Sequence, residues 1–276
     1  MQEAVFAAAL RALQRGEPAA LVTIVATHGS TPQRVGAKML VYADGRTAGT
    51  IGGGCYENDA AGQARDIIRT RQGRVVRYEL TDEIAEEQGL ICGGQMEVFI
   101  EPLVPSPDVY VIGAGHVSQS LSAIAHAVGF RVHVVDDRTM FANAGRFPDA
   151  VEIVAEPIPD WLARADLPPA AFVVVVTRGH KHDFEALKAL AGRPLRYVGM
   201  IGSRAKVLKI RAALEQAGVG ADWLATVHAP IGLRIGAVTP EEIAVSIVAE
   251  LVAIRRGALG QPETAGLTMT LGAPGA

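Results

Sequence analysis

Four short, strongly apolar runs in the second half of the chain limit its fold more than any other feature. They cover residues 109–112, 131–135, 172–176 and 197–201, with helical segments between them. Apolar strands that alternate with helices form a parallel sheet that helices cover on both faces. The sequence therefore predicts an α/β fold with a doubly wound parallel sheet in this half of the chain.

A glycine-rich motif, Gly113-Ala114-Gly115-His116-Val117-Ser118, follows the first run and begins a helix. The next strand ends at Asp136, 23 residues after Gly113, where a carboxylate commonly binds the ribose of an adenosine ligand. The pattern is typical of a Rossmann-type domain, in which these glycines, His116 and Asp136 would lie at a nucleotide. A glycine turn that serves packing alone is the alternative, because this fold also occurs without its cofactor.

Two more polar motifs follow the third and fourth apolar runs, at the edge where doubly wound sheets bind ligands. The first, residues 177–183, contains Arg178 and His180, which could line a ligand pocket. Two other interpretations stay open for it: a metal site made by its two histidines and Asp183, or a helix that Asp183 caps while the histidines are exposed.

The second motif, residues 199–204, places Ser203 and Arg204 where the next helix begins. Free helix amides beside Ser203 could bind an anion. The alternative is a Ser203 helix cap with no ligand.

Prolines at 102, 105 and 107 mark a linker between two domains. We therefore expect an N-terminal domain over 1–104, a Rossmann-like domain over 105–260 and a disordered tail over 261–276. The first domain should be a small mixed α/β unit with a two-residue hairpin turn at Asp44-Gly45. Its elements are predicted to be an amphipathic first helix, strands at 20–27, 37–42, 47–51, 74–80 and 96–101, and a helix that starts near Cys55.

Both cysteines of the chain lie beside glycines, in Gly52-Gly53-Gly54-Cys55 and in Cys92-Gly93-Gly94. Glycines let the backbone turn tightly and leave a sulfur atom accessible. At a helix start, backbone amides and the helix dipole favour the thiolate of Cys55. Sulfur chemistry or binding of a soft metal fits such a pair, whereas partly buried packing cysteines are the alternative.

The overall composition excludes several classes of protein. A net charge of −3 argues against nucleic-acid binding, and two cysteines in 276 residues do not make a disulfide scaffold. The longest apolar stretch, residues 243–254, is interrupted by Ser246 and Glu250, so no membrane span is expected. We expect a cytoplasmic protein with reduced thiols.

Taken together, the motifs resemble those of the XdhC/CoxI family, the accessory proteins of xanthine dehydrogenase and related molybdenum hydroxylases. The shared segments run in order through both halves of the chain. They are 26–33, 36–39, 52–57, 92–94, 113–117, 136–138, 177–180, 199–204 and 230–233.

The resemblance implies a homodimeric accessory factor rather than a stand-alone enzyme. Such a factor binds the molybdenum cofactor, a molybdopterin with a dithiolene and a phosphate, and helps to insert its sulfurated form into apo-xanthine dehydrogenase. A cysteine desulfurase is the implied sulfur source. Cys55, with Cys92, would carry sulfur or contact molybdenum. The residues expected to hold the rest of the cofactor are His28, Gln33, Arg34, Gly52, Gly53, Gly54, Gly113, Gly115, His116, Asp136, Arg178, His180, Ser203 and Arg204.

Two other functions stay open. The glycine motif and Asp136 would also suit an NAD(P)-dependent oxidoreductase, although no separate substrate domain follows the Rossmann unit. A scaffold that bridges desulfurase and target enzyme through its surface would need neither cysteine.

Overall fold

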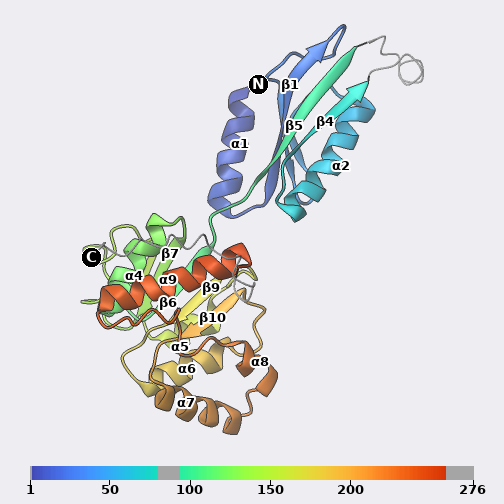
Figure 1. Cartoon of the computed structure of the whole chain (residues 1–276). Helices are drawn as coiled ribbons and strands as arrows, with labels where there is room; N and C mark the ends of the chain where they lie inside the picture. Colours follow the sequence, from blue (N-terminus) through green and yellow to red (C-terminus); the bar gives the residue numbers. More distant parts are fainter. Residues whose placement is uncertain (1, 80–93, 259–276) are drawn as a thin grey trace, which may run out of the picture. The chain divides into compact units, whose positions relative to one another are not determined.

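A computed structural model describes residues 2–79 and 94–258 of the chain. The chain divides into two compact units, with the boundary between Ser106 and Pro107 (Figure 1). Cys92 and the expected tail over 261–276 lie outside the described residues.

The N-terminal unit is built on an antiparallel sheet with strand order β3-β2-β1-β5-β4. Its strands are β1 (Ala19–His28), β2 (Lys38–Tyr42), β3 (Thr47–Gly49), β4 (Arg74–Glu79) and β5 (Gln95–Leu103). Helix α1 (Gln2–Arg15) packs on one face and α2 (Gly54–Thr70) on the other. Alternate residues of β1 explain this arrangement, because Leu21 faces α1 whereas Val22 faces α2.

The turn between β2 and β3 differs from the prediction by one residue. The Tyr42 amide donates to the Arg46 carbonyl and the Gly45 amide donates to the Tyr42 carbonyl, so three residues, Ala43 to Gly45, form the loop. Gly45 has φ +90°, the conformation that such a loop needs at its last position. The expected two-residue turn was therefore wrong, although Asp44 and Gly45 both lie in the loop.

The C-terminal unit contains a fully parallel sheet with strand order β10-β9-β6-β7-β8, which confirms the doubly wound α/β fold. Its strands are β6 (Asp108–Ile112), β7 (Arg131–Asp136), β8 (Glu152–Ala155), β9 (Phe172–Val175) and β10 (Tyr197–Met200). The sequence did not reveal β8, an edge strand without a fully buried residue.

Helices cover both faces of this sheet. They are α4 (His116–Ala127), α5 (Ile158–Arg164), α6 (His180–Leu190), α7 (Arg204–Gln216), α8 (Ala221–Thr226) and α9 (Pro240–Arg256). One buried core includes residues of α4 and α9, which pack against each other; the other includes residues of α5, α6, α7 and α8 (Figure 1). Alternate strand residues divide between them, so Val111 belongs to the first core and Ile112 to the second.

Among the helices of the described part, none is both long and apolar enough to cross a membrane.

Candidate functional site

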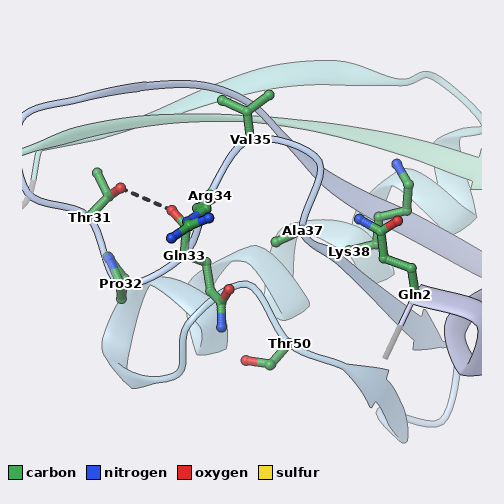
Figure 2. Close-up of a pocket in the computed structure, with 9 residues that line it drawn as sticks. All are labelled: Gln2, Thr31, Pro32, Gln33, Arg34, Val35, Ala37, Lys38 and Thr50. Atoms are coloured by element: carbon green, nitrogen blue, oxygen red, sulfur yellow. Dashed lines mark hydrogen bonds between the residues drawn. The ribbon is translucent and has the colours of Figure 1, made fainter.

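The loop between β1 and β2 lies beside a pocket of about 470 Å³ in the N-terminal unit (Figure 2). The predicted binding residues Gln33 and Arg34 line it, whereas His28 is exposed at the end of β1. Further lining comes from Lys38 and from Thr50, toward which the Gln33 side chain points (Figure 2). The loop thus contributes to a real cavity, with partners from β2 and from the chain that follows β3.

A glycine turn connects β3 to α2 next to this pocket. Gly52, Gly53 and Gly54 have φ values of +129°, +78° and +79°, which side chains other than glycine rarely adopt. A Cβ on Gly52 would also lie 2.7 Å from Pro32, a residue that lines the pocket. The turn therefore needs its glycines for conformation and, at Gly52, for close packing against the loop.

The carboxylate of Glu57 holds this turn from one helical turn further along. Its Oε2 accepts hydrogen bonds from the Thr50 hydroxyl at 2.5 Å and from the amides of Ile51 and Gly53 at 2.9 Å. Partial burial acts to raise the pKa of Glu57, but these hydrogen bonds together outweigh it and lower the pKa. Glu57 is therefore an anion that fixes the backbone turn leading to Cys55.

Cys55 is the second residue of α2, and its side chain is exposed. The helix start that the sequence predicted near Cys55 is confirmed, and the N-cap residue Gly53 provides no side-chain hydrogen bond there. An exposed thiol at the positive end of a 17-residue helix is well placed to react with or bind a soft ligand.

The second cysteine motif is described only at its last residue. Cys92 lies outside the described residues, but a Cβ on Gly94 would lie 2.3 Å from the Ser30 carbonyl oxygen and 2.6 Å from that of His28. Gly94 is thus a glycine because the backbone of the 28–36 loop lies directly against it.

In the C-terminal unit, the two fingerprint glycines have different reasons to be glycine. Gly113 has φ +113°, and a Cβ there would lie 2.5 Å from the Val176 carbonyl oxygen. Gly115 precedes α4 with an ordinary φ of −73°, and a Cβ there would meet nothing within 4 Å. Only Gly115, with the exposed His116 after it, leaves the backbone open to a ligand.

Asp136 is occupied by internal hydrogen bonds. It is 3% exposed, its oxygens accept from the Ala114 amide at 2.8 Å and from the Arg138 guanidinium at 2.8 Å, and a further bond comes from the Arg138 amide. Burial acts to raise the pKa of Asp136, but these bonds lower it to about 2. The structure therefore favours Asp137, not Asp136, as the carboxylate that could reach a ligand. Asp137 is partly exposed and pairs with Arg178 at 2.8 Å.

The prediction that Asp183 caps helix α6 was wrong. The helix begins at His180 with Gly179 as its N-cap, and Asp183 is fully buried in its first turn. There it accepts from the Thr177 hydroxyl at 2.7 Å and pairs with Lys206 Nζ at 2.5 Å. A buried carboxylate requires such partners, and Lys206 comes from α7, which lies outside the sequence motif.

The metal-binding alternative for this motif gains no support. His180 is exposed, and His182 lies 3.7 Å from Glu185 on its own helix. Among the residues that the structure describes, no group of three or more His, Cys, Asp or Glu side chains could hold a metal ion.

Ser203 caps helix α7 as predicted, because its hydroxyl accepts from the Lys206 amide at 3.3 Å. Arg204 follows it as an exposed side chain. Ser203 and Arg204 share the carboxyl edge of the sheet with Gly115, Asp137 and Arg178.

The predicted site residues thus form two groups, one in each unit. Sequence reasoning missed Thr50, Glu57 and Lys38 in the first group and Asp137 and Lys206 in the second. A signal existed for Glu57, since a Glu one turn into a helix commonly bonds back to amides before it.

Comparison with known proteins matches each of the two units to a family model. Residues 12–79 match the family model described as XdhC and CoxI family, and residues 109–251 match the XdhC Rossmann domain. The chain belongs to the XdhC/CoxI family. The resemblance inferred from the motifs is confirmed, and the Rossmann-like fold of the C-terminal unit with it.

Several relatives can be compared along most of the chain. The chain is 35% identical to YqeB of Escherichia coli K12 over 93% of its own length, but it spans only 47% of that relative. It is 24% identical to a Bacillus subtilis 168 protein named as a probable xanthine dehydrogenase subunit, covering 88% of this chain and 95% of that one. It is 22% identical to the E. coli K12 "Molybdenum cofactor insertion chaperone PaoD", covering 90% of this chain and 86% of that one.

A solved structure described as a xanthine dehydrogenase from Bacillus halodurans has a TM-score of 0.52 with this chain and 24% identity. The match covers 96% of this chain and 98% of that one, and it supports the fold alone.

Proposed function

We propose that this protein binds the molybdenum cofactor and assists its sulfuration and insertion into xanthine dehydrogenase or a related molybdenum hydroxylase. The observation that carries the proposal is the exposed thiol of Cys55, at the start of a helix and at the end of a glycine turn beside a polar pocket. Support also comes from two family relatives, one named for xanthine dehydrogenase and one for insertion of this cofactor.

Each part of the N-terminal site has a role in this proposal. Cysteine sulfur is a soft ligand, so Cys55 is suited to molybdenum or to a sulfur atom bound to it. Glu57 and the three glycines hold the turn so that the thiol stays exposed. Gln33 and Arg34, which line the pocket, would bind a polar part of the cofactor through their side-chain N–H donors. The cofactor is cargo, which the protein receives and passes on.

The wider setting of the proposal follows the family. The target would be the apo form of the molybdenum hydroxylase, a cysteine desulfurase would supply sulfur, and the protein would act as a homodimer in the cytoplasm. The crevice around Gly115, Arg178 and Ser203 would hold a further part of the cofactor or a nucleotide.

Replacement of Cys55 tests the proposal. Cys55→Ser should lower the molybdenum retained after cofactor loading and gel filtration at least tenfold, and should lower activation of apo-xanthine dehydrogenase to a similar degree. Asn58→Ser, an exposed change in the same helical turn, is the matched control and should behave as the wild type. Equal molybdenum retention by the wild type and Cys55→Ser would contradict a role for the thiol and favour a scaffold that works through its surface.

A second candidate function, an NAD(P)-dependent oxidoreductase, draws on the open backbone at Gly115. Titration with NADH and NADPH, followed by nicotinamide fluorescence, separates the two candidates. Tight binding together with hydride transfer to a substrate would replace the chaperone proposal.

A further inference from the structure

The pocket beside the 28–36 loop carries charge of one sign. Arg34 and Lys38 line it together with neutral polar side chains, Gln2, Gln33 and Thr50 among them. No carboxylate is among its described lining residues, and within residues 2–79 and 94–258 neither cation forms an ion pair. Two cations that share a concave site without a counter-charge favour an anionic ligand.

The Lys38 ammonium is positioned without being neutralised. Its Nζ donates to the Thr23 hydroxyl at 2.9 Å and lies 5.8 Å from the centre of the Phe6 ring. An ammonium has three N–H donors, so one donor fixes its place and two are available to a ligand. The half-buried side chain is thus held at the pocket with most of its binding capacity unused.

Arg34 shows the same combination of a fixed backbone and an available side chain. The Ala37 amide donates to the Arg34 carbonyl at 3.0 Å, and the Thr31 hydroxyl donates to the adjacent Gln33 carbonyl at 2.9 Å (Figure 2). The exposed guanidinium itself makes no hydrogen bond within the described part of the chain. A preordered loop lowers the entropy that binding would cost, and a guanidinium matches the geometry of phosphate oxygens.

Thr50 connects this pocket to the cysteine turn. It lines the pocket, donates to Glu57 at 2.5 Å and accepts from the Gly52 amide at 2.9 Å. Pro32 also lines the pocket and lies against Gly52, three residues before Cys55. A ligand with an anionic group at one end and a soft atom at the other could therefore reach both places along one edge of the N-terminal unit.

We propose that this pocket is a phosphate site, in which Lys38 and Arg34 bind the dianion of a phosphate monoester and the side-chain amide of Gln33 donates a further hydrogen bond to it. The source of the phosphate, the terminal group of the molybdenum cofactor, rests on the function proposed above. The cofactor would then bind in one direction, with its phosphate at Lys38 and its metal at Cys55.

Inorganic phosphate is the probe for the site itself, because its binding requires no molybdenum. Titration of the full chain, followed by broadening of the phosphorus-31 resonance, should give a dissociation constant that rises at least tenfold in Lys38→Met and in Arg34→Gln. Arg11→Gln is the matched control, since it removes an exposed charge from the same unit nine residues along α1 from Gln2, and it should bind within about twofold of wild type. Arg34→Gln also separates loss of binding from misfolding. The Arg34 side chain has no partner within the described residues, so its replacement should not change the fold.

Wild-type affinity in both pocket variants, or no broadening with the wild type, would overturn the phosphate site. Competition under anaerobic conditions identifies the source: molybdopterin should displace phosphate at a concentration at least tenfold lower than dephosphorylated molybdopterin does. Equal competition by the two pterins would overturn the assignment to the cofactor and leave free phosphate as the ligand. Should Lys38→Met lose phosphate while Cys55→Ser retains molybdenum, the proposed function fails and the phosphate site stands; the reverse result removes only the phosphate site.

Discussion

The two glycine turns of the molecule, one before α2 and one before α4, solve a similar problem in different ways. Each leads from a strand into a helix whose N-cap residue, Gly53 or Gly115, makes no side-chain hydrogen bond. In each turn, a carboxylate accepts hydrogen bonds from backbone amides. Glu57 comes from the helix that the turn begins, whereas Asp136 comes from the neighbouring strand β7.

The reasons for glycine also differ between the turns. In the first, all three glycines have positive φ, so conformation alone excludes other residues. In the second, Gly113 is required by conformation and space, whereas Gly115 is required by neither. The first turn therefore shapes the chain around an exposed thiol, and the second leaves a stretch of backbone open. This difference predicts which substitutions damage the fold and which damage only binding.

The largest effect is expected when the carboxylates are removed. Asp136→Ala leaves the partly buried Arg138 and the Ala114 amide without their partner, which should lower the free energy of unfolding of the C-terminal unit by about 3 kcal/mol. Glu57→Ala leaves the Ile51 and Gly53 amides without their acceptor, but water reaches these amides more easily than the Ala114 amide. The free energy of opening the start of α2 should therefore fall by about 2 kcal/mol.

Both tryptophans, Trp161 and Trp223, lie in the C-terminal unit, so urea unfolding followed by tryptophan fluorescence reports on Asp136→Ala. Hydrogen exchange of the α2 amides reports on Glu57→Ala. The exposed carboxylates Asp137 and Asp66 provide the controls Asp137→Ala and Asp66→Ala, each with an effect below about 0.5 kcal/mol. Equal losses from Asp136→Ala and Asp137→Ala would show that the internal network does not hold the turn.

Alanine at the two fingerprint glycines should separate fold from binding. Gly113→Ala should destabilise the C-terminal unit by about 2 kcal/mol, because its Cβ would overlap the Val176 carbonyl and its φ is unfavourable. Gly115→Ala should leave the free energy of unfolding unchanged or raise it by up to about 1 kcal/mol, through the unfolded state.

Urea unfolding measures both changes, and ligand titration of Gly115→Ala completes the test. A methyl group at 115 would stand before the α4 amides and weaken any ligand that approaches them. Strong destabilisation by Gly115→Ala would mean that this glycine serves the fold after all, and that the second turn is no different from the first.

Much of the fold followed from local sequence patterns. Apolar strands predicted the parallel sheet. The start of α9 is also specified locally, because Thr239 accepts from the Glu242 amide and Glu242 accepts from the Thr239 amide. These signals lie within a few residues of the structure they specify. Strand β8 escaped because an edge strand need not be continuously apolar.

The site was less predictable, since its contacts join distant parts of the chain. Aspartate commonly caps helices, but Asp183 is buried, and there it pairs with Lys206, 23 residues later in the chain. Asp136 has the spacing of a ribose-binding carboxylate, but Arg138 occupies its oxygens. The pocket at Lys38 combines α1, the 28–36 loop and the chain after β3, which no single motif could reveal.

Acid titration provides the smallest effect and compares the two carboxylates directly. The folded-state pKa of Asp136 is about 2, below its ordinary value of 3.8. The charged carboxylate therefore stabilises the folded state fully above about pH 5, and this contribution is lost as the pH falls from about 5 to about 2. Between about pH 7 and pH 3, the wild-type C-terminal unit should lose about 1 kcal/mol more than Asp136→Asn, which cannot titrate there. Urea midpoints from tryptophan fluorescence at each pH measure the difference.

The pKa of Glu57 is lowered as well, so the hydrogen-exchange protection of the α2 amides should also decline with acid. The decline should be smaller in Glu57→Gln. If the urea midpoints of wild type and Asp136→Asn fell by the same amount with acid, Arg138 and the Ala114 amide would not favour the charged carboxylate. The second turn would then depend on Gly113 packing alone, which is the sharper contrast with a first turn held by Glu57.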